Sequence, residues 1–330
     1  MNPITRDEFI QKAITADVDI FLSSISFEER CFVLPMLATE FRARNMVFFY
    51  NDNNIDLIKD NKYRFEQYYA NLNAKFISLD SEIPKVTYDK FEKQIDEFCA
   101  NSEKPLNVLL DITAFTHESL LICLRLLALR AKSLGKIYLG YVGASNYSTN
   151  SPTPEKKWLT KGVKQIRTVL GYPGFTDPTM KNHLMLLFGF ETERTKEIIE
   201  KYAYDHITIA IGSDSIQSEH GELNRVRFEE LLTDFPYAKK FEFTLKDCIR
   251  CRDQILEYLS QAEYKITNNV IAPLNNKMST VGAGLAAMVD TNIQLAYAQA
   301  NVYNVSGYSS PSSDFYFQEL TLPLTQTSSH

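Results

Sequence analysis

The sequence contains two similar halves, in which related short segments follow one another in the same order. The matched segments are 19–30 with 184–194, 63–67 with 226–230, 107–110 with 269–272, and 137–141 with 293–297. Their offset falls steadily, from 164 residues between Glu29 and Glu193 to 156 residues between Ile137 and Ile293. A duplicated unit with small deletions gives this pattern. Duplicated units are commonly related by a pseudo-twofold axis, so we expect the function to lie where the halves meet.

Each half alternates short apolar runs with amphipathic segments, a pattern typical of a parallel sheet covered on both faces. The expected strands are 19–23, 46–50, 75–79, 106–111 and 136–142 in the first half, and 184–188, 207–212, 240–244, 268–272 and 292–296 in the second. The predicted fold class is therefore α/β. It comprises two tandem Rossmann-like units, each a mostly parallel five-stranded sheet with helices on both faces.

The predicted domain boundaries follow from this alternation. Unit 1 is expected to span residues 1–147 and unit 2 residues 183–324, with a bridging segment at 148–182 and a disordered tail at 325–330. Within the bridging segment, residues 158–170 have apolar side chains at helical spacing, which predicts a helix. Elsewhere, residues 27–44 are expected to form one helix and residues 311–313 a loop.

Composition narrows the classes of function. Of the 330 residues, 45% are hydrophobic and 23% are charged, and the net charge is −6. This balance is typical of a soluble globular protein and argues against an extended nucleic-acid surface. No apolar run reaches the ~18 residues of a membrane-spanning helix, and the N-terminus lacks a signal-peptide core. We therefore expect a cytoplasmic protein that does not bind membranes.

The five cysteines predict neither a disulfide framework nor a metal centre. They are odd in number and scattered along the chain, whereas disulfide frameworks use even numbers at regular spacing. Cys248 and Cys251 have the spacing of a metal or redox motif, but no second Cys or His pair accompanies them, and helix packing is the favoured interpretation. No metal and no cofactor is expected.

In open α/β sheets, ligands bind beyond the carboxyl ends of the strands, at the point where the strand order reverses. After the first strand come Ser24, Ser26, Glu28, Glu29 and Arg30. Hydroxyl and backbone N–H groups at a helix start are suited to an anionic ligand. The alternative is structural, with Ser26 as an N-cap and Glu29 completing a capping box. The chain has no Gly-x-Gly-x-x-Gly and no Walker-type loop, which argues against NAD and ATP sites.

The loop after the fourth strand of the first half contains Asp111, Thr113, Thr116 and His117. It presents a carboxylate, hydroxyls and an imidazole that can titrate near neutral pH. We predict that Asp111, Thr113 and His117 contact a ligand. The alternative is that Thr116 caps the following helix and Asp111 satisfies N–H groups of the loop.

The second half differs at the equivalent loop, where Asn275 and Lys277 replace the acid and the imidazole. A lysine at a helix start favours an anion, so Asn275 and Lys277 are candidate ligand residues. After the fifth strand, Tyr303 stands among asparagines and is a candidate for stacking on a base. Plain packing is the alternative for this tyrosine.

The turn Asp111-x-Thr113-x-x-x-His117 resembles the Asp/Asn-x-Ser/Thr-x-x-x-Arg/Lys turn of CRISPR-associated Rossmann-fold (CARF) sensor domains. Tandem units in one chain are also similar to the arrangement of some members. The resemblance implies a cyclic oligonucleotide bound across the twofold interface, and in some members cleaved. It implies as ligand-binding residues Ser24, Ser26, Asp111, Thr113, His117, Asn275 and Lys277. His117 stands where the family has Arg or Lys, and Asn275 where it has Ser or Thr.

Two hypotheses use this site. In the first, the protein binds a nucleotide-like small molecule between its halves as a sensor in prokaryotic antiviral defence, and a separate protein partner carries the effector. In the second, it is a nucleotide hydrolase or ring nuclease. His117 or Glu28 then acts as general base, while Lys277 and Arg30 stabilise developing negative charge.

A third hypothesis needs no ligand. The protein is then a scaffold subunit that docks a partner through an aromatic surface formed by Phe315, Tyr316 and Phe317. The sequence leaves open whether the chain is an enzyme.

Overall fold

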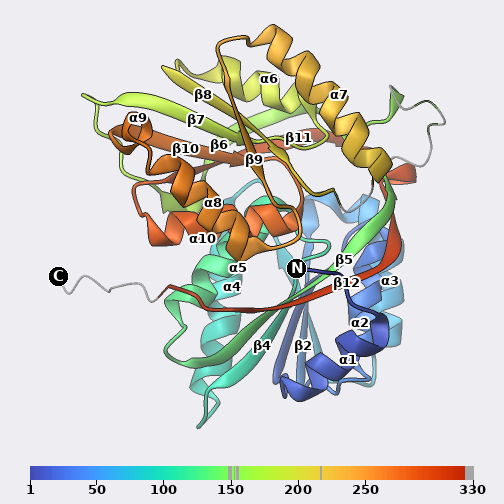
Figure 1. Cartoon of the computed structure of the whole chain (residues 1–330). Coiled ribbons are helices and arrows are strands. Elements are labelled where there is room, and N and C mark those ends of the chain that lie inside the picture. The colour runs from blue at the N-terminus through green and yellow to red at the C-terminus, as the bar shows by residue number, and fades with distance from the viewer. Residues whose placement is uncertain (148–150, 152, 154–155, 216–217, 324–330) are drawn as a thin grey trace. The chain divides into compact units, whose positions relative to one another are not determined.

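The computed structural model describes residues 1–147, 151, 153, 156–215 and 218–323 (Figure 1). The chain forms two compact units. Unit 1 combines Met1–Ser145 with Ser309–His330, and unit 2 is Asn146–Tyr308. Each unit is α/β with one six-stranded sheet. The fold class is as predicted, although each sheet has one strand more than expected.

The sheet of unit 1 has the strand order β12-β5-β4-β1-β2-β3. Its strands are β1 (Ile20–Ser24), β2 (Asn45–Asn51), β3 (Ala74–Leu79), β4 (Leu106–Asp111), β5 (Leu134–Tyr147) and β12 (Ser309–Leu320). The pairs β1–β2, β2–β3, β1–β4 and β4–β5 are parallel. All five residues of β1 are buried, as expected of a central strand covered on both faces.

The sheet of unit 2 has the corresponding order, β6-β11-β10-β7-β8-β9. Its strands are β6 (Thr160–Pro173), β7 (Lys181–Leu187), β8 (His206–Gly212), β9 (Lys239–Phe243), β10 (Thr267–Pro273) and β11 (Gln294–Tyr303). The four pairings from β11 to β9 are parallel, whereas β6 pairs antiparallel with β11. The two sheets therefore share one topology, as the sequence duplication predicts.

Helices connect the strands in both units. Those of unit 1 are α1 (Arg6–Thr15), α2 (Val33–Ala38), α3 (Ile55–Tyr68), α4 (Pro84–Ala100) and α5 (His117–Leu129), with 3-10 turns η1 (Glu29–Phe32) and η2 (Asp52–Asn54). Those of unit 2 are α6 (Thr192–Lys201), α7 (Ser218–Asp234), α8 (Cys248–Leu259), α9 (Ala262–Lys265) and α10 (Lys277–Val289), with the turn η4 (Val305–Gly307).

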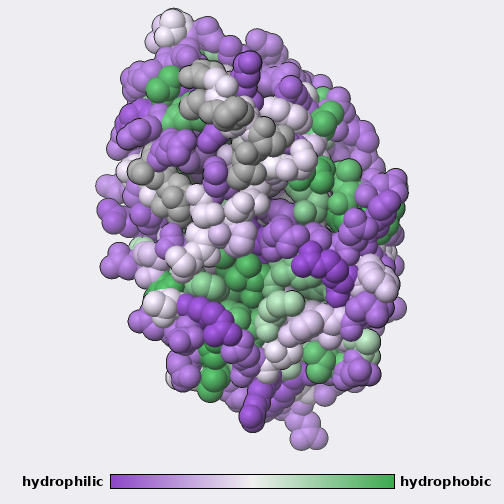
Figure 2. Space-filling model, turned by 90° about the vertical axis from the view of Figure 1, so that its right-hand side faces the viewer, coloured by the Kyte–Doolittle hydropathy of each residue, from purple (hydrophilic) through white to green (hydrophobic). Residues whose placement is uncertain are grey.

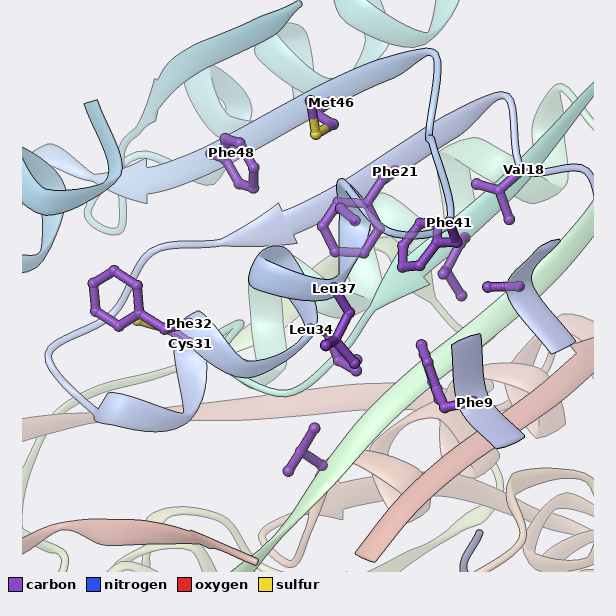
Figure 3. Packing of buried hydrophobic residues seen from close by; sticks show 14 of the residues in the cluster. Phe9, Val18, Phe21, Cys31, Phe32, Leu34, Leu37, Phe41, Met46 and Phe48 are labelled. Atoms are coloured by element: carbon purple, nitrogen blue, oxygen red, sulfur yellow. The ribbon is translucent and has the colours of Figure 1, made fainter. Parts of the chain in front are cut away.

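Neighbouring residues of β2 show how unit 1 is layered. Phe48 contacts Phe65 of α3 and Phe49 contacts Phe91 of α4, with ring centroids 5.1 and 4.5 Å apart. Successive side chains of a strand point to opposite faces, so α3 and α4 cover opposite faces of the sheet. On the α3 side, phenylalanines of α1, β1, η1 and β2 form one continuous core (Figure 3).

The sixth strand of each sheet comes from the other repeat. In the chain β6 follows β5 but pairs with β11, and β12 follows β11 but lies beside β5. The two repeats have thus swapped their last strands. For this reason the observed division differs from the predicted boundaries: Ser309–His330 cluster with unit 1, and the predicted bridging segment 148–182 falls within unit 2.

The expected helix at 158–170 is wrong, because these residues lie in and just before the edge strand β6. The pairing of β6 with β11 shifts register between Gln299 and Ala300. Such a bulge breaks the two-residue alternation that normally identifies a strand. The apolar residues of β6 therefore had helical spacing although the segment is extended.

Two further predictions of local structure are wrong. Residues 27–44 form the turn η1 and the short helix α2 rather than one helix. Residues 311–313 lie inside β12 instead of forming a loop, and Pro311 is tolerated there because β12 is an edge strand. The predicted tail at 325–330 lies outside the described residues.

In the part of the chain that the structure describes, none of the helices combines the length and apolar character needed to cross a membrane.

Candidate functional site

Each sheet has one point where the strand order reverses. In unit 1 it lies between β1 and β4, and in unit 2 between β7 and β10. The loops that leave these strands at their carboxyl ends diverge to opposite sides, which opens the position where α/β proteins bind ligands. The predicted site residues Ser24, Asp111 and Asn275 lie at or next to these strand ends.

Asp111, the last residue of β4, is buried beside the end of β1. Its Oδ2 accepts a hydrogen bond from Ser23 Oγ at 2.8 Å, and its Oδ1 accepts one from Thr113 N at 3.0 Å. The Thr113 hydroxyl accepts one from Val142 N of β5 at 3.2 Å. Asp111 and Thr113 therefore join three neighbouring strands, and neither side chain is exposed to a ligand in this conformation.

Burial raises the pKa of Asp111 from 3.8 to about 6, although hydrogen bonds from Thr113 and Ser23 and the charge of Arg30 favour its ionised form. The penalty of desolvating the carboxylate exceeds these contributions. Perturbed carboxyl groups are common at functional sites, and they also occur in structural networks such as this one.

The serines after β1 do not form a helix cap. Ser26 Oγ accepts a weak hydrogen bond of 3.4 Å from Glu28 N. The residue that precedes η1 is Glu28, which makes no side-chain cap bond. The alternative capping box of Ser26 and Glu29 is thus wrong. Ser24 is buried within β1, whereas Ser26 is partly exposed.

His117 is the first residue of α5 and is partly exposed. Thr116 is the N-cap of α5, and its hydroxyl accepts a hydrogen bond from Ser119 N at 3.2 Å. This confirms the alternative prediction that Thr116 caps the helix. Among the candidates of unit 1, His117 and Ser26 are the ones whose side chains reach the surface beside the switch point.

Glu28 and Arg30 form a buried cluster with Ser309, the first residue of β12. Glu28 Oε2 accepts hydrogen bonds from Arg30 Nη2 at 2.8 Å and from Ser309 Oγ at 2.5 Å. Arg30 Nη1 donates to the carbonyl oxygen of Val142 in β5 at 3.2 Å. These contacts attach β12 to the sheet of unit 1. The candidate catalytic residues Glu28 and Arg30 are therefore paired with each other.

Unit 2 repeats this arrangement with different atoms. Glu191 Oε1 accepts hydrogen bonds from the backbone N–H groups of Leu159 and Thr160, at 3.2 and 2.9 Å, where β6 begins. Arg194 donates to the carbonyl oxygen of Ala298 in β11. Burial raises the pKa of Glu191, and the charge of Arg194 opposes this shift. The echoed Phe-Glu segments of the sequence thus each secure an edge strand.

Asn275 and Lys277 lie at the start of α10. Asn275 Nδ2 donates to the carbonyl oxygen of Phe188 after β7, while its Oδ1 accepts from Asn276 N at 2.8 Å. A Cβ atom at Gly189 would lie 2.3 Å from the carbonyl oxygen of Leu274, so the loops after β7 and β10 touch. Lys277 is partly exposed as the first residue of α10.

Tyr303 is the last residue of β11, where it pairs with Thr160 of β6. It is partly buried. Tyr303 therefore lies at the carboxyl end of the sheet, next to Thr160, which Glu191 contacts. Strand β10 lies between β11 and the switch point.

A ring stack in unit 2 was not predicted. The imidazole of His220 lies between Phe190 and Tyr147, with centroids 4.7 and 4.4 Å apart, and Arg227 lies 4.0 Å above Phe190. Burial, together with the charges of Arg227 and Lys157, lowers the pKa of His220 to about 4. Arg227 is the counterpart of Arg64 in the duplicated sequence, and Arg64 stacks on Phe32 at the same distance of 4.0 Å. This correspondence was the signal in the sequence that pointed to the Arg227 contact.

A hollow of about 460 Å³ lies between α2 and α3 of unit 1. It is lined by Phe32, Met36, Tyr63, Arg64, Phe65, Gln67, Tyr68 and Tyr69. Figure 2 shows apolar side chains gathered in the lower half of the face that includes these helices. Arg64 is the one charged residue of this lining and is paired with Glu29 at 2.9 Å, so the hollow suits an apolar group better than an anion.

Cys248 and Cys251 are buried in α8, and burial raises the pKa of both thiols. Neutral, inaccessible thiols are poor ligands and poor nucleophiles. Among the described residues, no group of three or more His, Cys, Asp or Glu side chains is arranged to hold a metal ion.

The third hypothesis placed an aromatic docking surface at Phe315, Tyr316 and Phe317. The structure contradicts this, because Phe315 and Tyr316 are 5% and 2% exposed within unit 1. Phe315 and Phe317 pack on Phe9 of α1, with centroids 5.8 and 5.4 Å apart. These rings belong to the core of unit 1.

The sequence matches no protein-family model and no curated protein. Among solved structures, it is similar to the cytoplasmic domain of a prokaryotic cation chloride cotransporter, with 6% identity and a TM-score of 0.24. The match covers 88% of this chain and 98% of the other. At this TM-score the likeness carries no conclusion about fold or function.

Proposed function

We propose that the protein binds an anionic, nucleotide-like ligand at the strand-end switch points of its two units. The observation that carries the proposal is the duplicated switch point, at which a 13-residue helix starts in each unit. The first helical residue is His117 in unit 1 and Lys277 in unit 2. Both residues are partly exposed and can carry positive charge.

The electrostatics of these positions support an anion. The N-terminus of a helix carries a partial positive charge and unpaired N–H groups. Lys277 adds a full charge there, and His117 adds one when it is protonated. The hydrogen bonds of Asp111, Thr113 and Asn275 fix the loops that carry the two helix starts. These residues therefore position the loops, whereas the sequence predicted that they contact the ligand.

A cyclic oligonucleotide is the ligand class to test first, because the Asp111–His117 turn resembles that of CARF sensors. A sensor role in prokaryotic antiviral defence, with an effector on a separate cytoplasmic protein, would follow from such binding. No feature of the site favours hydrolysis over binding, because Glu28 and Arg30 contact each other in a buried cluster.

Isothermal titration calorimetry with cyclic oligonucleotides, linear dinucleotides and mononucleotides tests the proposal. Binding by the wild-type protein is expected to weaken at least about tenfold in Lys277→Ala, because a charged hydrogen bond contributes about 1.5–3 kcal/mol. His117→Ala should also weaken it, because the imidazole can donate a hydrogen bond to an anion. Lys136→Ala is the control, since this exposed lysine pairs with Glu319 in unit 1. Absence of heat with every ligand would refute the proposal.

The stoichiometry of the titration tests the sequence-based expectation that one ligand serves both halves. One ligand per chain, weakened by either variant, supports a shared ligand. Two ligands per chain, each weakened by one variant, would mean that the units bind separately.

A further inference from the structure

The strand swap determines how β12 is connected along the chain to the rest of unit 1. Its sheet is completed by β12, which the chain reaches only after passing through the whole of unit 2. The connection from β11 of unit 2 to β12 is short, residues 304–308. When unit 2 is folded, β12 is therefore connected to it by a short segment. When unit 2 is unfolded, β12 is connected to the rest of unit 1 by a long loop of residues 146–308.

The attachment of β12 to unit 1 is specific and extensive. Its first residue, Ser309, is bound by Glu28, and Phe315 forms a two-bond backbone bridge with Ile4 at 2.8 and 3.1 Å. Phe317 packs on Tyr138 of β5, with ring centroids 5.1 Å apart. The N-terminal segment and β12 therefore close the edge of unit 1 together.

We propose that the swapped strand β12 couples the two units, so that loosening of unit 2 releases the edge strand of unit 1. The cost of closing a loop rises with its length. When unit 2 unfolds, the docking of β12 must close a much longer loop and becomes less favourable. By linkage, detachment of β12 also destabilises unit 2, because the unfolded form of unit 2 is then less restricted. The coupling requires no ligand and does not depend on the proposed function.

Hydrogen exchange by mass spectrometry on the full chain tests the coupling. Phe188→Ala removes a fully buried ring from the core of unit 2. The expected result is faster exchange both in unit 2 and in β12, with the gain in β12 at least about fivefold. If Phe188→Ala does not fold, Ile209→Val is a milder change in the same core. The control is Val226→Ala, which alters an exposed residue of α7.

A second variant separates the tether from any effect of packing. A flexible Gly/Ser insertion that lengthens residues 304–308 about fourfold should increase the opening of β12 about twofold, since loop closure scales as the 3/2 power of length and the loop also includes residues 146–159. Because the coupling is reciprocal, exchange in unit 2 should rise by at most the same factor. The proposal is overturned if the insertion leaves β12 unchanged, or if β12 keeps its wild-type rate while the core variant accelerates unit 2.

Discussion

Glu28 accepts a hydrogen bond of 2.5 Å from the hydroxyl of Ser309, 281 residues later in the chain. The same carboxylate oxygen accepts from Arg30, and both charged side chains are 5% exposed. Glu191 makes the corresponding contact in unit 2 through backbone N–H groups at the start of β6. A glutamate of each repeat thus binds the first residue of the swapped strand in its own sheet.

Arg30→Ala should destabilise unit 1 by about 3–5 kcal/mol, because it leaves the Glu28 carboxylate buried without its partner. Urea denaturation measures the loss. The matched control is Lys136→Ala, which removes an exposed ion pair with Glu319 at the other end of β12. That control should leave the unfolding free energy nearly unchanged. An equal effect of the two variants would contradict the assigned role of the Glu28 cluster.

Asp111→Asn should change how stability depends on pH. The pKa of Asp111 is raised to about 6 in the folded protein, so folding favours its protonated form. Its contribution to stability is complete below pH 3.8 and is lost as the pH rises through 6. The stability of the variant relative to wild type should therefore increase by about 3 kcal/mol between pH 4 and 7. A difference that stays constant over this range, measured by urea denaturation, would refute the assignment.

Much of the fold could be predicted from local sequence, because the central strands are continuous apolar runs between turn signals. The cap at Thr116 and the position of Asp111 at a strand end were also readable from sequence. The helix α1 was missed, although Thr5 and Glu8 form a capping box at its start. Its amphipathic pattern is short and precedes the first strong strand.

The other misses have non-local causes. Nothing near β12 in the sequence shows that it completes the sheet of unit 1, since its contacts are with distant residues such as Ile4, Glu28 and Tyr138. Similarly, Glu28, Arg30 and Asp111 have the chemistry of ligand-binding groups. Only the structure shows that Glu28 and Arg30 pair with each other, and that Asp111 binds Ser23 and the backbone of Thr113.

Protonation of His183 should destabilise unit 2 in acid. The ring is fully buried, bonded to Asn269 and Thr208 at 2.8 Å each, and burial lowers its pKa from 6.5 to about 4. The unfolded chain therefore binds the proton more readily, and stability falls as the pH drops from 6.5 to 4. This shift corresponds to about 3 kcal/mol.

His183→Gln tests this contribution because glutamine does not titrate. The pKa of His220 is lowered in the same direction, so the variant should retain part of the acid sensitivity. Thermal unfolding of both proteins from pH 7 to 4 gives the comparison. An unchanged slope in His183→Gln would show that His183 does not control the acid response.

Gly282→Ala in α10 should destabilise unit 2, contrary to the usual effect of this substitution in a helix. Alanine normally favours a helix interior over glycine by about 1 kcal/mol. Here the added Cβ would lie 2.8 Å from both Cβ and Sγ of Cys251 and 3.1 Å from the carbonyl oxygen of Cys248. Relief requires α8 and α10 to separate, and such overpacking costs about 1–3 kcal/mol. Urea denaturation should show a lower midpoint with an unchanged slope. A raised midpoint would contradict this interpretation. It would mean that α8 can move away from α10 at little cost, and that the two helices do not need a glycine here to pack closely.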